Sequence, residues 1–275
     1  MSEASWTCPN DMRLQHSGNE LASEFNQKKP LPARNPPAHP KTRSALVQTI
    51  KPEWAKTPCI VAAPGPSLSQ EQADLVRATG WPVLVCQDAH RLLPWADKLY
   101  GCDTRWWKHY EGVPDFAGEK WSTHHHGVAN NKAEDQELYG LHLVNGDRQQ
   151  FAGFSLDPSV IHYGDNSGFQ SINLAVLLGS PYIVLIGFDM SHKNGHHFFG
   201  KHGGSLHNQE KFERWIPEFD AAAKNLPADR TIINATPGSA IHCWKHMPLE
   251  QAIENYMLHR NGAEPDAGGC RHSPR

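Results

Sequence analysis

The sequence predicts an α/β fold: a Rossmann-like parallel sheet flanked by helices, with a small lid insertion over residues 110–150. Short apolar runs alternate along the chain with segments of helical pattern, which is typical of parallel strands joined by crossover helices. Glycine, serine and aspartate residues follow several of these runs. Because ligands bind beyond the carboxyl ends of the strands in such sheets, the same residues predict one binding site.

Six short apolar runs predict buried strands, because each is bounded by proline, glycine or polar turn residues. The clearest of them is the run at residues 181–186, where a proline precedes an unbroken apolar series. The expected strands are residues 58–63, 82–86, 98–101, 160–163, 181–186 and 230–235.

Four segments predict helices, and two of them carry clear end signals. Ser69 and Gln72 predict a capping box at the start of the first helix, which Gly80 is expected to end. Ser167 is expected to cap a strongly apolar helix that Gly179 closes. The expected helices are residues 69–78, 167–178, 208–225 and 248–258.

Composition narrows the class of protein. The 275 residues are 39% hydrophobic and carry a net charge of -3, which supports a core and argues against general affinity for nucleic acid or anionic membranes. The six cysteines form no Cys-x-x-Cys pair, which favours a reducing compartment. No apolar stretch reaches about 18 residues and no secretion signal is evident, so we expect no membrane span and a cytoplasmic location, in the host cytoplasm if phage-encoded.

Three regions are expected along the chain. Residues 1–45 are polar and proline-rich, which predicts a flexible N-terminal arm or a strap on another subunit of a homo-oligomer. Residues 46–260 are expected to form the Rossmann-like domain that carries the predicted binding site. Residues 261–275 are polar and glycine-rich, which predicts a disordered tail.

The residues that follow the strands are expected to meet in one nucleotide pocket. Gly65 would let a ligand approach the backbone, and the amides of Ser167 and Gly168 would attract a phosphate to a helix start. Each segment alone is equally typical of an ordinary turn or helix cap. Neither G-x-x-x-x-G-K-[ST] nor G-x-G-x-x-G occurs. The expected nucleotide-binding residues are Gly65, Pro66, Ser67, Gln87, Asp88, Asp103, Ser167, Gly168, Gly187, Phe188, Pro237, Gly238 and Ser239.

Asp189 and one histidine of a histidine-rich stretch, His202, are the candidate catalytic residues. Asp189 follows a buried strand and can accept hydrogen bonds from a sugar or ribose, or cap a loop. A histidine titrates near neutral pH and can act as a general base. The stretch also admits a metal site or a solvated loop, but its spacing matches no zinc motif, so no metal ligand is predicted. Its histidines are His192, His196, His197, His202 and His207.

Two further segments have open interpretations. Residues 103–107, an aromatic and charged segment at a strand end, predict either a surface that lines an acceptor or stacks on a base, or a buried pair of Trp106 and Trp107 under the lid. Residues 124–126 are three consecutive histidines, expected in a surface loop, with metal binding as the alternative.

The order of four motifs resembles a known family. The motifs are Gly65-Pro66-Ser67-Leu68, Ser167-Gly168, Leu185-Ile186-Gly187-Phe188-Asp189 and Gly200-Lys201-His202. Over roughly residues 60–249 the chain resembles the bacterial sialyltransferases with a single Rossmann-like domain, and related domains in flagellin glycosyltransferases and uncharacterised phage proteins.

The resemblance implies a CMP-linked sugar as donor, bound without a metal or other cofactor. It implies that the Gly-Pro-Ser turn and the Ser-Gly helix start contact the nucleotide, that Gln87 stands where the family has asparagine, and that His202 is the catalytic base. It also implies that residues 236–239 form a loop over the nucleotide.

Two departures from that family concern the sugar and the leaving group. Residues 190–195 contain no tyrosine, whereas the family uses tyrosines there to stabilise the departing phosphate. Gly164 replaces a basic residue just before the Ser-Gly pair. These departures weigh against sialic acid itself and leave the nucleotide pocket in place.

Three functions follow from these observations. The first is a metal-independent glycosyltransferase acting on an acceptor hydroxyl of a surface glycan or a modified phage nucleobase. The second is a magnesium-dependent pyrophosphokinase, since an archaeal hydroxymethylpterin pyrophosphokinase has a related domain and Asp88, Asp103 and Asp189 offer carboxylates for the ion. The third is a non-catalytic nucleotide-binding module.

Overall fold

The computed structural model describes residues 47–124, 139–203, 206 and 210–260. The predicted N-terminal arm over residues 1–45 and the predicted tail over residues 261–275 lie outside the described residues. A subunit contact through the arm therefore stays a prediction.

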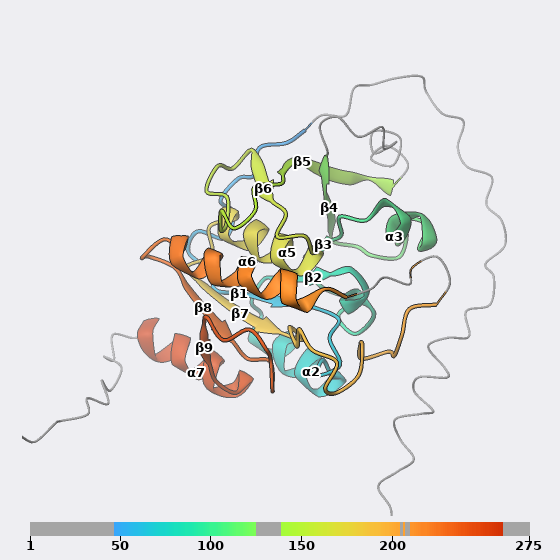
Figure 1. Ribbon diagram of the computed structural model, residues 1–275. Helices are drawn as coiled ribbons and strands as arrows, with labels where there is room; N and C mark the ends of the chain where they lie inside the picture. The colour runs from blue at the N-terminus through green and yellow to red at the C-terminus, as the bar shows by residue number, and fades with distance from the viewer. Residues whose placement is uncertain (1–46, 125–138, 204–205, 207–209, 261–275) are drawn as a thin grey trace, which may run out of the picture. The chain divides into compact units, whose positions relative to one another are not determined.

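In the described part of the chain, nine strands form one parallel sheet in the order β6-β5-β4-β3-β2-β1-β7-β8-β9 (Figure 1). The chain builds the sheet outward from β1 to β6, then crosses to the other side of β1 with β7, so the connection reverses between β1 and β7. This topology confirms the predicted fold class. The strands are β1 (Cys59–Ala62), β2 (Val83–Cys86), β3 (Lys98–Tyr100), β4 (Glu119–His124), β5 (Leu141–Asp147), β6 (Val160–His162), β7 (Tyr182–Ile186), β8 (Thr231–Asn234) and β9 (Lys245–His246).

Helices cover both faces of the sheet (Figure 1). The helices are α2 (Gln70–Thr79), the 3-10 helix η1 (Gln87–Arg91), α3 (Thr104–His109), α5 (Ser167–Leu177), α6 (Phe212–Asn225) and α7 (Leu249–Arg260). Side chains alternate along β1, so Val61 packs into the core beneath α5 and α6 and Ile60 into the core beneath α2 and α7. Burial on both faces explains why the central strands are almost continuously apolar.

The helix ends follow the sequence signals with one correction. At α2, the Ser69 hydroxyl accepts from the Gln72 amide at 3.3 Å, and Gly80 ends the helix with φ of 64°, as predicted. At α5, the cap is Asn166 and not Ser167, because the Asn166 carbonyl oxygen accepts from the Phe169 amide at 2.8 Å. The Ser167 hydroxyl lies instead 3.0 Å from Cys102 Sγ.

The predicted lid insertion over residues 110–150 is wrong for the described part of that segment. β4 and β5 both lie inside the sheet, between β3 and β6. Sequence periodicity missed them because their polar residues are satisfied inside the sheet: the Trp121 indole donates to Glu119 at 2.8 Å, and Lys98 pairs with the same carboxylate. Residues 125–138, including His125 and His126, lie outside the described residues, whereas His124 ends β4.

Two expectations from composition can be compared with the described chain. Cys59, Cys86, Cys102 and Cys243 are free thiols, and burial raises the pKa of the Cys59 and Cys86 thiols to about 12. None of the described helices combines the length and the apolar character that crossing a bilayer would require.

Candidate functional site

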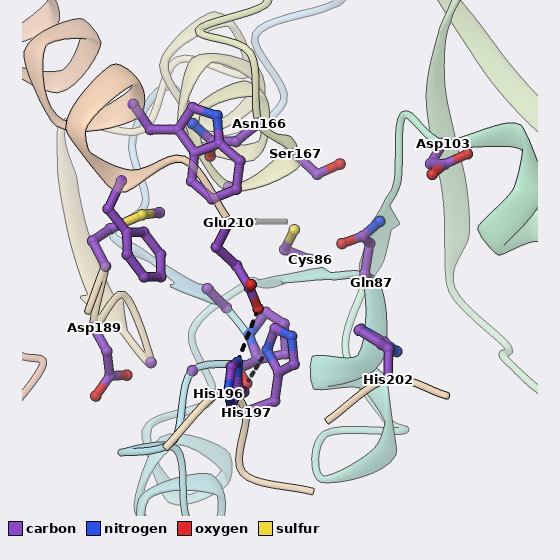
Figure 2. Close-up of a pocket in the computed structure, with 18 of the residues that line it drawn as sticks. Cys86, Gln87, Asp103, Asn166, Ser167, Asp189, His196, His197, His202 and Glu210 are labelled. Atoms are coloured by element: carbon purple, nitrogen blue, oxygen red, sulfur yellow. Dashed lines mark hydrogen bonds and ion pairs between the residues drawn. The ribbon is translucent and has the colours of Figure 1, made fainter. Parts of the chain in front are cut away.

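A cavity of about 680 Å³ lies at the carboxyl ends of β1, β2, β3 and β7, beside the start of α5 (Figure 2). The reversal of strand order between β1 and β7 opens a crevice there, because the following crossovers run to opposite sides. Strand ends far apart in sequence thus meet at one site.

The structure places nine of the predicted site residues in the wall of this cavity, and six do not line it. The lining residues among them are Gly65, Pro66, Gln87, Asp103, Ser167, Gly168, Gly187, Asp189 and His202. The predicted residues that do not line it are Ser67, Asp88, Phe188, Pro237, Gly238 and Ser239.

The turns after β1 and β7 pack directly on each other. The Gly65 amide donates to the Gly187 carbonyl at 3.0 Å, and Gly187 adopts a positive φ of 71°. A Cβ on Gly65 would lie 2.3 Å from that carbonyl, and one on Gly187 would lie 2.0 Å from the Ala63 carbonyl. Glycine is therefore required at both positions, and the two turns form a close-packed wall.

Asp189 is held beneath this wall by Ser67. Its carboxylate accepts from the Ser67 hydroxyl at 2.7 Å and from the Ser67 amide at 3.3 Å, and Asp189 is only 4% exposed. Burial raises the pKa of the Asp189 carboxyl, and the two Ser67 hydrogen bonds work against that rise. Ser67 thus supports a cavity residue without reaching the cavity itself.

The start of α5 faces the cavity with its first residues. Asn166, Ser167 and Gly168 line it, and the amides of the first helical turn have no partner within the helix. The neighbouring Asp165 has a positive φ of 55°, as do two other wall residues, Gln87 at 45° and Met190 at 49°. Non-glycine residues held in this conformation cluster at binding sites.

His202 stands on the opposite side of the cavity from the start of α5 and backs onto Asp88 (Figure 2). Its Nε2 lies 3.8 Å from Asp88 Oδ2, and its side chain is 18% exposed. Burial lowers the pKa of His202 below its ordinary value, and the Asp88 carboxylate acts in the opposite direction. The imidazole is therefore neutral at pH 7 and has a carboxylate ready to stabilise its protonated form.

Asp88 was expected to bind nucleotide, but it is completely buried behind the wall. Its oxygens accept from the Trp106 indole at 2.7 Å and the Tyr110 hydroxyl at 2.6 Å, and Arg91 lies 3.6 Å away. Trp106 and Trp107 are accordingly buried, which favours the packed-pair interpretation over a stacking surface. Asp88 does follow the end of β2, as predicted, but the 3-10 turn of η1 directs its carboxylate into the core and away from the cavity.

An aromatic cluster surrounds His202. The ring of His197 lies 4.8 Å from it and that of Phe199 lies 4.9 Å from it, and the Arg91 guanidinium lies 4.7 Å above Phe199. Burial lowers the pKa of His197 to about 4, so this second imidazole is also neutral at pH 7. The contacts fix the orientation of the His202 ring.

The late loop does not cover the cavity. Pro237 and Gly238 are exposed, and the Ser239 hydroxyl donates to the Phe188 carbonyl at 2.6 Å. Phe188 is itself buried in the core, with its amide bonded to the Thr236 hydroxyl at 3.0 Å. This loop braces the end of β7, which presents Gly187 and Asp189 to the cavity.

Other lining residues lie outside the set expected to bind nucleotide. Thr104 and Arg105 belong to the segment 103–107 that was expected as a possible acceptor surface, and Arg105 pairs with Asp103 at 2.8 Å, where Asp103 caps α3. Phe212 and Trp215 enter the wall from α6, a helix whose position beside the cavity is a matter of tertiary packing. The lining residues that no expected segment contained include Cys86, Cys102, Arg148, Asp165, Glu210, Phe212 and Trp215.

Comparison with known proteins adds a fold-level likeness. The sequence matches no protein-family model, and no curated protein is significantly similar to it. Among solved structures, the MAf glycosyltransferase from Magnetospirillum magneticum AMB-1 is similar in fold, with a TM-score of 0.50 and 13% identity. The match covers 81% of this chain and 39% of that protein, so the chain spans well under half of its length. The likeness supports the Rossmann-like α/β fold.

Proposed function

We propose that this chain is a glycosyltransferase that moves a sugar from a nucleotide-activated donor to an acceptor hydroxyl. The observation that carries the proposal is one cavity at the strand-order reversal, with the start of α5 on one side and the neutral imidazole of His202 on the other. The glycosyltransferase activity of the structural neighbour supports the same class.

The cavity suits a nucleotide sugar in size and chemistry. Its volume of about 680 Å³ lies in the range of small-molecule sites. The amides of Ser167 and Gly168 and the positive end of the α5 dipole favour a phosphate. The resemblance of Gly65-Pro66-Ser67 and Ser167-Gly168 to the sialyltransferase motifs favours a CMP-linked donor.

The transfer requires one proton acceptor and one stabilised leaving group. His202 Nε2 faces Asp88, which leaves Nδ1 to take the proton of the acceptor hydroxyl. The acceptor oxygen bonds to the anomeric carbon of the sugar as the bond from that carbon to the phosphate oxygen breaks. The α5 amides stabilise the charge on the released phosphate, and Asp189 orients the sugar or ribose hydroxyls. This scheme needs no metal ion at the leaving phosphate.

The acceptor belongs to one of two classes, a surface glycan or a modified nucleobase. The competing pyrophosphokinase chemistry needs carboxylates that hold magnesium together. Here Asp88 is engaged by Trp106 and Tyr110, Asp103 by Arg105, and Asp189 by Ser67. These separate engagements favour transfer of a sugar over transfer of a pyrophosphate.

A thermal-shift screen with CMP-, UDP-, GDP- and ADP-linked sugars, with and without magnesium, tests donor binding. A ligand at one hundred times its Kd adds about 2.7 kcal/mol to stability, which shifts the melting temperature measurably. We expect stabilisation by a CMP-linked sugar without magnesium, followed by release of CMP when the donor is incubated with acceptors. Stabilisation without release of nucleotide from any acceptor would instead indicate a non-catalytic binding module, and stabilisation by none would end the proposal.

A further inference from the structure

Two histidines and a glutamate from different segments come together beside the cavity. His192 and His196 lie in the loop after β7, and Glu210 precedes α6. One ligand atom from each residue lies within 4.8 Å of the other two. The proposed transfer chemistry uses none of these three residues.

The distances between the donor atoms are close to those of a zinc site. His192 Nε2 lies 3.7 Å from Glu210 Oε2, and His196 Nδ1 lies 3.3 Å from Glu210 Oε1. Zinc bonds of roughly 2.0–2.1 Å at tetrahedral angles place neighbouring ligand atoms about 3.3 Å apart. The separation of His196 from Glu210 matches this spacing, and His192, which faces the other oxygen of the same carboxylate, must move closer for all three to share one ion.

The local backbone sets the two imidazoles side by side. The Gly195 amide donates to the His192 carbonyl at 3.1 Å, which closes a turn between the histidines, and their ring centroids lie 4.2 Å apart. Phe212, in the first turn of α6, packs against the His192 ring at 4.8 Å. The spacing is His-x-x-x-His without the glutamate of the zinc-protease helix, so only the fold reveals Glu210 as the third ligand.

The chemistry of the three groups also suits a metal ion. They combine two imidazoles with one carboxylate, which are donor types that zinc and related divalent ions take in proteins.

We propose that His192, His196 and Glu210 bind one divalent transition-metal ion of the zinc type. Two histidines and one glutamate leave a fourth coordination position for water or a ligand oxygen. Because His196 and Glu210 line the cavity, the ion fastens the histidine-bearing loop to the start of α6 along one edge of it (Figure 2). The site goes beyond the proposed transfer, whose leaving phosphate is stabilised by α5.

Calorimetric titration of the chelator-treated full chain with zinc chloride tests the site. We expect one equivalent of zinc to bind tightly, and His196→Ala and Glu210→Gln each to weaken that binding at least about a hundredfold, since even outer partners of metal ligands contribute ten- to a hundredfold. Cobalt in place of zinc is expected to give the visible absorption of a four- or five-coordinate ion in the unaltered chain and not in the two variants.

The matched control is His242→Ala, which removes an exposed histidine outside the cavity and is expected to leave zinc affinity unchanged. Circular dichroism of the metal-free variants establishes that they fold. Zinc affinity that is equal in the unaltered chain and in folded His196→Ala, or no tight zinc binding at all, would overturn the proposal. Neither result depends on nucleotide or on sugar transfer, so the test is separate from that of the proposed function.

Discussion

The two walls of the cavity are built in different ways. The glycine wall is made by residues 63–66, residues 187–189 and the start of α5. Backbone hydrogen bonds join its two turns, and Gly65 and Gly187 have no space for a side chain. The histidine wall is made by residues 196–202 and contains no regular secondary structure of its own. It is held mostly by ring contacts, with a single backbone hydrogen bond to the other wall, from the Phe198 amide to the Pro64 carbonyl at 3.2 Å. Substitutions in the glycine wall are therefore expected to lower the free energy of unfolding, whereas substitutions in the histidine wall are expected to lower the rate of transfer.

His202→Gln is expected to give the largest effect, because it should lower turnover without lowering stability. Loss of a positioned general base lowers kcat by roughly 10²–10⁴-fold, which is about 3–5 kcal/mol of barrier. Because glutamine keeps a polar side chain at this partly exposed position and only ring contacts are lost, the urea unfolding midpoint should change little. Turnover of the donor and urea unfolding are measured on the same preparation, with His242→Gln as the control. A shifted unfolding midpoint with unchanged turnover per folded molecule would show that His202 contributes to stability and not to the chemistry.

Gly65→Ala is the corresponding change in the glycine wall. Its methyl group would lie 2.1 Å from Asp189 Oδ2 and 2.3 Å from the Gly187 carbonyl, so backbone must move, which costs about 3 kcal/mol. The control, Gly80→Ala, has a positive φ and no atom within 4 Å, so it isolates conformational strain of about 1 kcal/mol. Urea unfolding measures both variants, and equal losses would show that the two turns are not close-packed.

The sequence predicted the glycine wall far better than the histidine wall. The strands at β1 and β7 are uniformly apolar, and residues such as Gly65 and Asp189 immediately follow them, so their meeting at one edge follows from parallel topology. Asp88 also follows a strand, but one turn of 3-10 helix rotates it into the core, and no local signal specifies that turn. Contacts such as that of Glu210 with His196 depend on α6, which only the tertiary fold places.

A similar difference explains why β4 was not predicted as a strand from the periodicity of the sequence. β2 and β7 are apolar on both faces and were predicted, whereas β4 mixes Glu119, Lys120 and Trp121 and resembles a polar loop. Its neighbours satisfy those polar groups: Lys120 Nζ donates to the Gly112 carbonyl at 3.0 Å. A strand stabilised by such long-range partners shows no alternation of apolar and polar residues strong enough to predict it.

Ser67→Ala tests how much the hydrogen bond from Ser67 to Asp189 stabilises the glycine wall. It removes the 2.7 Å hydrogen bond to the buried Asp189 carboxylate, which contributes about 2 kcal/mol to the free energy of unfolding at pH 7. Because the Ser67 bonds lower the pKa of Asp189, the variant should have a still higher carboxyl pKa. Its deficit should then shrink as the pH falls and the carboxyl becomes protonated.

Ser159→Ala is the matched control, because the Ser159 hydroxyl makes the same 2.7 Å bond to the exposed carboxylate of Asp157. We expect little change of stability there, since water replaces the hydroxyl. Urea unfolding at several pH values compares the two variants. A deficit in Ser67→Ala that stays constant with pH would show that the Asp189 charge is not involved.

The pH dependence of transfer gives the smallest effect and concerns the pair His202 and Asp88. In the proposed transfer the base must be neutral, and burial holds the pKa of His202 below 6.5, so kcat/KM should be level near neutral pH and fall only below 6.5. The unfolded chain takes up this proton first, so the contribution of His202 to stability is complete above 6.5 and declines as the pH falls from there. Because the Asp88 carboxylate raises the pKa of His202, Asp88→Asn should move the acid limb of activity to lower pH. The pH profile of the unaltered chain is decisive even if that variant folds poorly, because an acid limb above 6.5 would mean that a different group accepts the proton.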